Sequence, residues 1–177
     1  MSCEFVLNCS EYVDWQLIIA SISATRGRIV VPNKDTSDKE YQDLYKIWDA
    51  AGLNYSSARW ENYYPGDYCK TISSTFETIL DVTHIRSWIS RIDPGYSAPW
   101  HYDIDHDEQE YLKLGKLRRF ICFIGDPAPG HISIVNDRSF YNEASGNVYE
   151  WNDYRAWHAG ANVGLVPKYQ YNFLSYS

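Results

Sequence analysis

Short apolar segments of strand length, separated by turn signals, dominate the second half of this chain and most constrain its fold. The segments span residues 84–92, 99–104, 117–124, 131–136, 147–151, 154–159 and 168–176. The turns between them include Asp93-Pro-Gly95, Asp126-Pro-Ala-Pro-Gly130 and Ser145-Gly-Asn147. Many short strands with this punctuation are typical of an all-β sandwich, jelly roll or barrel. The sequence therefore predicts a mainly β protein.

Helical signals are confined to the first 81 residues. One helix is expected over 10–21, where apolar residues recur at helical spacing: Val13, Leu17 and Ala20. A second follows the capping-box pattern Ser37-Asp-Lys-Glu40 and ends near Gly52. Its apolar face would carry Tyr41, Leu44, Tyr45 and Trp48. A short strand over 27–31 and a short helix over 73–80 complete a mixed, helical N-terminal layer.

These patterns indicate a single domain of 177 residues, in which a layer formed by 1–81 covers a β core formed by 82–177. The aromatic content, with 16 Tyr, 7 Trp and 6 Phe, supports a β-rich body because aromatic residues favour strands. The same rings could also form the walls of a pocket.

The charge of the chain restricts its partners. The formal net charge is −7, and the only adjacent basic pair is Arg118–Arg119, so the basic face of a duplex-DNA binder is missing. Nucleic acid is therefore not the expected partner, and the overall acidity favours a neutral or basic substrate. No apolar run reaches the roughly 20 residues needed to cross a membrane.

The N-terminus lacks the basic start and apolar stretch of a signal peptide, so we expect a cytoplasmic protein. Its four cysteines, at positions 3, 9, 69 and 122, fit neither a zinc motif nor a disulfide framework. We expect reduced thiols, with Cys122 in the core.

The segment Pro99-Trp-His-Tyr-Asp103 carries the strongest chemical signal. Residues two apart on a strand point to the same side, so His101 and Asp103 can reach one point while the aromatic residues between and before them face away. An imidazole and a carboxylate are two of the three ligands of the 2-His-1-carboxylate site of non-haem iron. His158 is the best candidate for the third.

Other interpretations of this segment stay open. An H-x-D pattern arises often by chance, and here it lies in an acidic stretch that also contains Asp105, Asp107, Glu108 and Glu110. His106 could form a different site with a nearby aspartate, and His131 is an alternative second histidine. His84, early in an expected strand, is best explained as structural.

Lys168, ten residues after His158, extends the pattern. The order His101-x-Asp103, His158, Lys168 resembles the iron(II)/2-oxoglutarate-dependent oxygenase superfamily, in particular the prolyl 4-hydroxylases. That resemblance implies a double-stranded β-helix (a cupin-like jelly roll) with iron(II) held by His101, Asp103 and His158. It also implies that Lys168 binds the distal carboxylate of the cosubstrate 2-oxoglutarate, as a buried cation can.

The surrounding sequence resembles the same superfamily. Arg91-Ile-Asp-Pro-Gly95 is similar to the R-x-x-P-G approach to the first ligand, and His158-Ala-Gly-Ala-Asn162 is similar to a motif of the aspartyl/asparaginyl β-hydroxylases. In those enzymes an arginine on the following strand helps to bind the cosubstrate, and Arg118 matches it better than Arg119. The aspartate of H-x-D and the lysine at 168 depart from the β-hydroxylase pattern, so the subfamily stays open.

The resemblance implies a dioxygenase that hydroxylates an amino-acid or peptide side chain or another small molecule, with succinate and carbon dioxide as co-products. Ascorbate would serve as a reductant. Two alternatives remain: a cupin metalloenzyme that does not use 2-oxoglutarate, and a non-catalytic ligand-binding β-sandwich.

Strand alternation makes a further prediction. If Lys168 points inward, Gln170 and Asn172 share its side, while Tyr169, Tyr171 and Phe173 point outward toward a helical layer. On the same reasoning, Tyr154, Ala156 and His158 share one side, and His131 and Ser133 share another.

Overall fold

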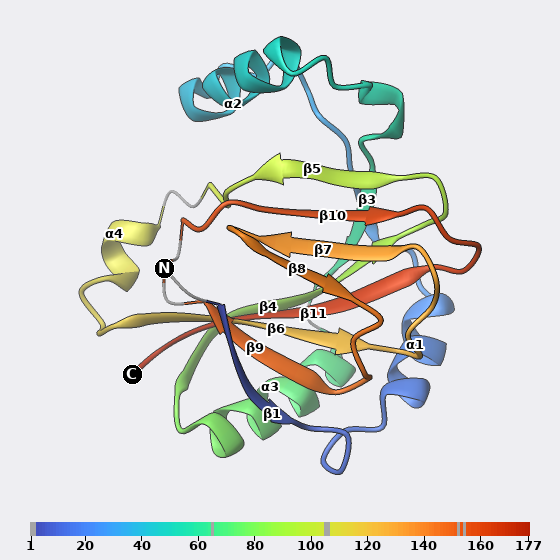
Figure 1. Ribbon diagram of the computed structural model, residues 1–177. Helices are drawn as coiled ribbons and strands as arrows, with labels where there is room; N and C mark the ends of the chain where they lie inside the picture. Colours follow the sequence, from blue (N-terminus) through green and yellow to red (C-terminus); the bar gives the residue numbers. More distant parts are fainter. Residues whose placement is uncertain (1–2, 65, 105–106, 152, 154) are drawn as a thin grey trace.

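Two antiparallel sheets form the body of the protein in the computed structural model, which describes residues 3–64, 66–104, 107–151, 153 and 155–177 (Figure 1). The larger sheet has the strand order β1 (Cys3–Asn8), β9 (Asn147–Trp151), β6 (Leu117–Ile124), β11 (Lys168–Tyr176), β4 (Thr83–Ile92), β3 (Trp60–Tyr63) and β2 (Arg28–Val30). The smaller sheet has the order β5 (Ser97–His101), β10 (His158–Asn162), β7 (His131–Val135) and β8 (Arg138–Tyr141). The protein is thus mainly β, as predicted.

Four α-helices occur in the described residues: α1 (Trp15–Ser23), α2 (Lys39–Ala50), α3 (Asp67–Leu80) and the short α4 (Glu108–Tyr111), together with a 3₁₀ turn, η1 (Tyr55–Ser57). Helices α1 and α3 lie against the larger sheet, whereas α2 lies beyond the β5 edge of the smaller sheet (Figure 1). The three longer helices fall in the first 81 residues. That region also supplies β1, β2 and β3 to the larger sheet, and only β2 was anticipated.

The helix starts show where local sequence signals were right. The carboxylate of Asp38, rather than Ser37, caps α2 by accepting from the backbone N–H of Glu40 at 2.9 Å, and Gly52, with φ 71°, follows the helix end. The predicted face of α2 is largely confirmed, with Leu44, Tyr45 and Trp48 buried.

The predicted face of α1 was wrong. Its cap is Asp14, and its buried residues are Trp15, Ile18 and Ile22. Leu17, expected inside, is 65% exposed.

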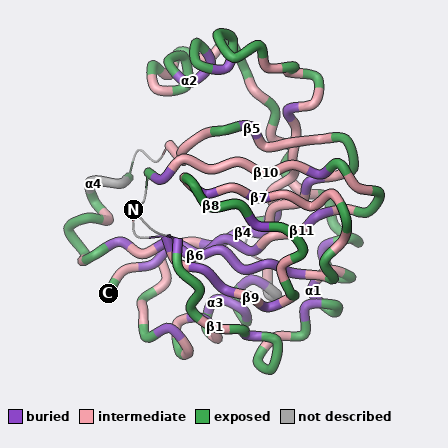
Figure 2. Tube along the Cα trace, in the orientation of Figure 1, coloured by how far each residue is buried: buried purple, intermediate pink, exposed green. Residues whose placement is uncertain are grey.

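One face of the larger sheet packs on α1 and α3 and forms the main core (Figure 2). Tyr171 and Phe173 of β11 are fully buried there, and both rings contact Phe76 of α3, at centroid distances of 5.1 and 5.5 Å. Phe120 and Cys122 of β6 lie on the same side. The predicted outward direction of Tyr171 and Phe173 is therefore confirmed.

The opposite face of the larger sheet meets the smaller sheet. Near β6 and β9 the contact is apolar and includes Ile121, Phe123, Val135, Phe140 and Tyr149. Toward β4 and β11 the side chains become polar, and a cavity opens between the sheets and α2. The alternation of each strand thus separates an apolar core on one face from a polar site on the other.

The four cysteines are free and buried, and Cys122 lies in the core as expected. Within the described residues, no helix is long and apolar enough to cross a membrane.

Replacing Phe173 with alanine should cost about 3–5 kcal/mol of the free energy of unfolding, because it removes a fully buried ring from the main core. Urea unfolding followed by circular dichroism measures this loss. Leu165→Ala is the matched control: that side chain is 94% exposed, so its change should stay within about 0.5 kcal/mol. Equal effects of the two substitutions would contradict the packing described here.

Candidate metal centre

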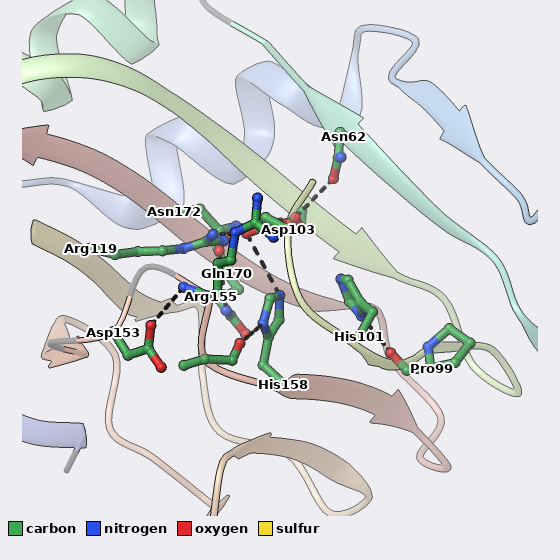
Figure 3. Close-up of polar contacts among 12 residues, drawn as sticks. Asn62, Pro99, His101, Asp103, Arg119, Asp153, Arg155, His158, Gln170 and Asn172 are labelled. Carbon is green, nitrogen blue, oxygen red and sulfur yellow. Dashed lines mark hydrogen bonds and ion pairs between the residues drawn. The ribbon is translucent and has the colours of Figure 1, made fainter. Parts of the chain in front are cut away.

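Two histidines meet across the smaller sheet. His101 ends β5 and His158 begins β10, and the antiparallel register places them directly opposite each other, with ring centroids 4.2 Å apart. Asp103 follows β5 and turns its carboxylate to the same point, with Oδ2 3.8 Å from His158 Nε2 (Figure 3). One potential ligand atom from each residue lies within 4.8 Å of the others. The structure therefore brings the three predicted ligands together.

Backbone carbonyls fix both imidazoles. His101 Nδ1–H donates to the carbonyl of Pro99 at 2.5 Å, and His158 Nδ1–H donates to the carbonyl of Ala156 at 2.9 Å. A carbonyl can only accept, so the proton of each neutral ring lies on Nδ1 and the Nε2 lone pair faces the other ligands. Such hydrogen bonds are the usual way in which metal-ligating histidines are oriented.

The electrostatics of the pair favour neutral rings. Burial lowers the pKa of His101 to about 4, against the hydrogen bond to Pro99, and the charge of Arg119 lowers it further. Burial also lowers the pKa of His158, with contributions from His101 and Arg119. Neutral imidazole is the form that binds a metal ion. The donor set of two imidazoles and one carboxylate fits a divalent iron ion.

Arg119 is a site residue that the sequence analysis did not select. Its guanidinium, with the side chain only 2% exposed, makes an ion pair with Asp103 Oδ2 (Figure 3). The group also lies against the rings of Trp88 and Trp151, at 5.2 and 4.5 Å from their centroids. Arg119 thereby holds the carboxylate beside the two histidines.

Lys168 begins β11 and is buried, with 4% of its surface exposed. Its Nζ donates to the carbonyl of Ile132 and to Ser133 Oγ, both at 2.6 Å. Gly160 on β10 makes room for this amine, because a Cβ there would lie 3.1 Å from Nζ. Burial lowers the pKa of Lys168 to about 7.

Lys168 and the three potential ligands line one cavity of about 440 Å³. Gln170 and Asn172 line it too, which confirms the predicted alternation of β11. Their side chains continue a hydrogen-bonded chain along the cavity floor. It runs from Lys168 Nζ to Ser133 Oγ, Gln170 Oε1, Asn172 Oδ1, Ser90 Oγ and Asn62 Oδ1, and every donor points away from the lysine. The floor is therefore a satisfied polar network.

Arg118, the arginine that the sequence analysis expected to bind the cosubstrate, lies elsewhere. Its guanidinium makes a bidentate pair with Glu150, at 2.8 and 2.7 Å. Among the described residues, Arg119 rather than Arg118 lines the cavity. Alternation places the two arginines on opposite faces of β6, and the structure shows that the face of Arg119, shared with Ile121 and Phe123, is the one toward the smaller sheet.

The other candidate residues are also placed. His131 Nε2 contacts the carbonyl of Val166 at 3.0 Å, and His84 stacks on Phe173, so both serve packing here. Tyr102, expected to face away, lines the cavity because β5 ends at His101 and its alternation stops there. The alternative site built on Asp105 and His106, and the predicted orientation of Tyr154, lie outside the described residues.

No protein-family model matches the chain, and no curated protein sequence matches it. Among solved structures, the chain is similar to a viral collagen prolyl hydroxylase from Paramecium Bursaria Chlorella virus-1, described as a 2OG complex, at 16% identity and a TM-score of 0.49, covering 88% of this chain and 98% of that one.

A prolyl hydroxylase from Trichoplax adhaerens, described in complex with a hypoxia inducible factor peptide fragment, matches at 10% identity and a TM-score of 0.49, over 92% of this chain and 88% of that one. A predicted oxalate decarboxylase from Thermotoga maritima matches at 9% identity and 0.46, over 88% and 96%. These likenesses are remote in sequence.

The burial of Lys168 predicts a specific pH dependence of stability. Its pKa falls from 10.5 in the unfolded chain to about 7 in the folded one, so only the unfolded chain is protonated between these values. Stability should therefore be lost as pH falls from 10.5 to 7. Relative to Lys168→Met, the wild type should gain about 1–4 kcal/mol between pH 7 and 10 in urea unfolding. The exposed Lys46→Met control should show no such gain, and parallel curves for wild type and Lys168→Met would contradict the burial.

Proposed function

We propose that this protein is an iron(II)- and 2-oxoglutarate-dependent oxygenase built on a double-stranded β-helix. The observation that carries the proposal is a 2-His-1-carboxylate cluster, His101, Asp103 and His158, in one cavity with the buried cation Lys168. Because a facial triad leaves coordination positions open for other ligands, a cavity that also contains a fixed cation suits a bidentate acid cosubstrate.

His101, Asp103 and His158 would hold the iron, whose chemistry when bound is to activate dioxygen and couple the conversion of 2-oxoglutarate to succinate and carbon dioxide with oxidation of a substrate. The hydrogen bonds to Pro99 and Ala156 keep both Nε2 atoms aimed at the metal position. Arg119 makes an ion pair with the Asp103 carboxylate beside them.

Lys168 would bind the distal carboxylate of 2-oxoglutarate, as the sequence resemblance implies. Its Nζ has three N–H groups, of which Ile132 and Ser133 take two, so a third remains for the carboxylate. An anion beside the amine favours the protonated form, so binding of the cosubstrate stabilises the charge that burial opposes. The product would be a hydroxylated amino-acid or peptide side chain or another hydroxylated small molecule.

The direct test is succinate formation. Purified protein supplied with iron(II), ascorbate and 2-oxoglutarate should release succinate, slowly when no substrate is present. Asp103→Ala should abolish this release and lose bound iron, because the only carboxylate of the cluster is gone. Asp137→Ala, an exposed acid, is the control and should keep both. Iron binding that survives Asp103→Ala unchanged would refute the proposed centre, and absence of metal binding in the wild type would favour a non-catalytic sandwich.

Binding of 2-oxoglutarate should weaken above neutral pH. Since Lys168 has a pKa of about 7, the fraction carrying a charge falls as pH rises, and affinity should fall by up to about tenfold per pH unit between 7 and 9. Titrations in the presence of manganese(II) at several pH values measure this slope. Lys168→Arg, which stays charged, should flatten the slope, and Lys168→Ala should weaken binding at every pH. An equally steep slope in Lys168→Arg would exclude the lysine as its origin.

A further inference from the structure

Two of the four buried cysteines lie in contact, although they are far apart in the sequence. Cys9 follows β1 and Cys122 lies within β6, and their Sγ atoms are 3.7 Å apart. Both side chains are fully buried in the main core, on the face of the larger sheet that packs on α1 and α3. The metal centre lies on the other face, so the proposed function does not use this pair of thiols.

Backbone hydrogen bonds hold the two cysteine-bearing segments together. Cys9 N–H donates to the carbonyl of Gly146 at 2.9 Å, and Gly146 N–H donates to the carbonyl of Phe123 at 2.8 Å. Gly146, with φ 87°, has no room for a side chain, because a Cβ there would lie 2.8 Å from the backbone nitrogen of Ser10. Ser10 Oγ in turn donates to the carbonyl of Ser145 at 2.7 Å. The close approach of the two thiols is therefore set by the backbone of this turn.

The two thiols differ in acidity. The hydrogen bond from the Cys122 thiol lowers the pKa of Cys9, against the effect of burial, and Trp15 lowers it further. Burial raises the pKa of Cys122 well above its usual range, and Cys9 adds to the rise. Because the thiolate is the reactive form of a cysteine, Cys9 is the better nucleophile of the pair.

The two thiols also differ in their distance from solvent. Cys9 lies between the exposed residues Asn8 and Ser10, directly after β1, which is the outermost strand of the larger sheet (Figure 1). Cys122 lies on β6, which has β9 and β11 as neighbours on its two sides. Local opening of the turn after β1 would expose Cys9 while the central strands stay paired. A small oxidant should therefore reach Cys9 first.

We propose that Cys9 and Cys122 are a redox-sensitive pair that hydrogen peroxide converts to a reversible disulfide. The sulfur of Cys9 attacks one oxygen of the peroxide, the O–O bond breaks, and a sulfenic acid and one water form. The sulfur of Cys122 then attacks that of Cys9, and the hydroxyl group leaves with the thiol proton as a second water. The two thiols lose two protons and two electrons in total, and the peroxide gains them.

This proposal is independent of the proposed oxygenase function. It revises the expectation that all four thiols stay reduced. The sulfur atoms would move from 3.7 Å to the separation of about 2.0 Å found in a disulfide, through rotation of side chains whose backbones are already held together. A thiol reductant would reverse the reaction by exchange.

The disulfide should stabilise the fold. It would join the turn after β1 to a central strand and link residues 113 positions apart. A cross-link over so long a segment restricts the unfolded chain, so the oxidised protein should melt about 5–15 °C above the reduced one. Addition of dithiothreitol should return the melting temperature to that of the reduced protein.

Peptide mapping tests the proposal directly. The folded protein is treated with a small excess of hydrogen peroxide, its remaining thiols are blocked with N-ethylmaleimide in denaturant, and the digest is analysed by mass spectrometry with and without dithiothreitol. A reducible peptide pair that joins Cys9 to Cys122 is expected, with Cys3 and Cys69 blocked by the maleimide. Four blocked cysteines, a link to Cys3 or Cys69, or over-oxidation of Cys9 without a link would overturn the proposal.

Variants locate the effect. Cys9→Ser should abolish both the linked peptide and the rise in melting temperature. Cys3→Ser is the matched control, because Cys3 is also a buried cysteine of the β1 region but lies in a different core cluster, and this variant should keep both. Circular dichroism checks that each variant is folded. A rise in a folded Cys9→Ser protein equal to that of the wild type, or no rise in cross-linked wild type, would also overturn the proposal.

Discussion

The burial of Tyr171 and Phe173 against Phe76 is the contact on which the site depends. β11 is a central strand of the larger sheet, and once its aromatic residues are locked between the sheet and the helices, the alternating residues must point the other way. That direction carries Lys168, Gln170 and Asn172 into the cavity. The apolar core therefore sets the position of the polar side chains, and a slip of one residue would remove all three from the cavity at once.

The metal centre needs polar and charged groups, whereas packing of the same two sheets removes these groups from water. Burial opposes the charged forms of Lys168 and of both histidines, as their lowered pKa values show. The fold compensates with specific partners: carbonyls for the imidazoles, Arg119 for Asp103, and Ser133 and Ile132 for the lysine. Neutral rings suit a site that binds a metal cation, and an acid bound beside Lys168 would offset the cost of burying the lysine charge.

Sequence patterns predicted the features that depend on local periodicity. The bounds of β6 and β11 followed from apolar runs of strand length between turn signals. The inward row of β11 followed from alternation, and the α2 face followed from helical spacing. The three potential ligands and Lys168 were found because their types and order form a recognisable motif.

Features that depend on long-range pairing could not be found in this way. β1 and β3 are short, and they become strands because they pair with β9 and β4, far along the chain. Arg119 and Arg118 are neighbours with the same chemistry, and only the orientation of β6 in the sheet distinguishes their surroundings. The contact between Cys9 and Cys122 was hidden for the same reason, since the two residues are 113 positions apart.

The uniform direction of the hydrogen-bonded chain on the cavity floor has a consequence for selectivity. From Lys168 to Asn62, each group gives its proton to the next, so no member can reverse without leaving its neighbour with two facing donors or two facing acceptors. The floor therefore behaves as one rigid template rather than as several adaptable side chains. The floor cannot rearrange to accept a hydrogen bond at Lys168. The cavity should therefore exclude a ligand that presents a hydrogen-bond donor to Lys168.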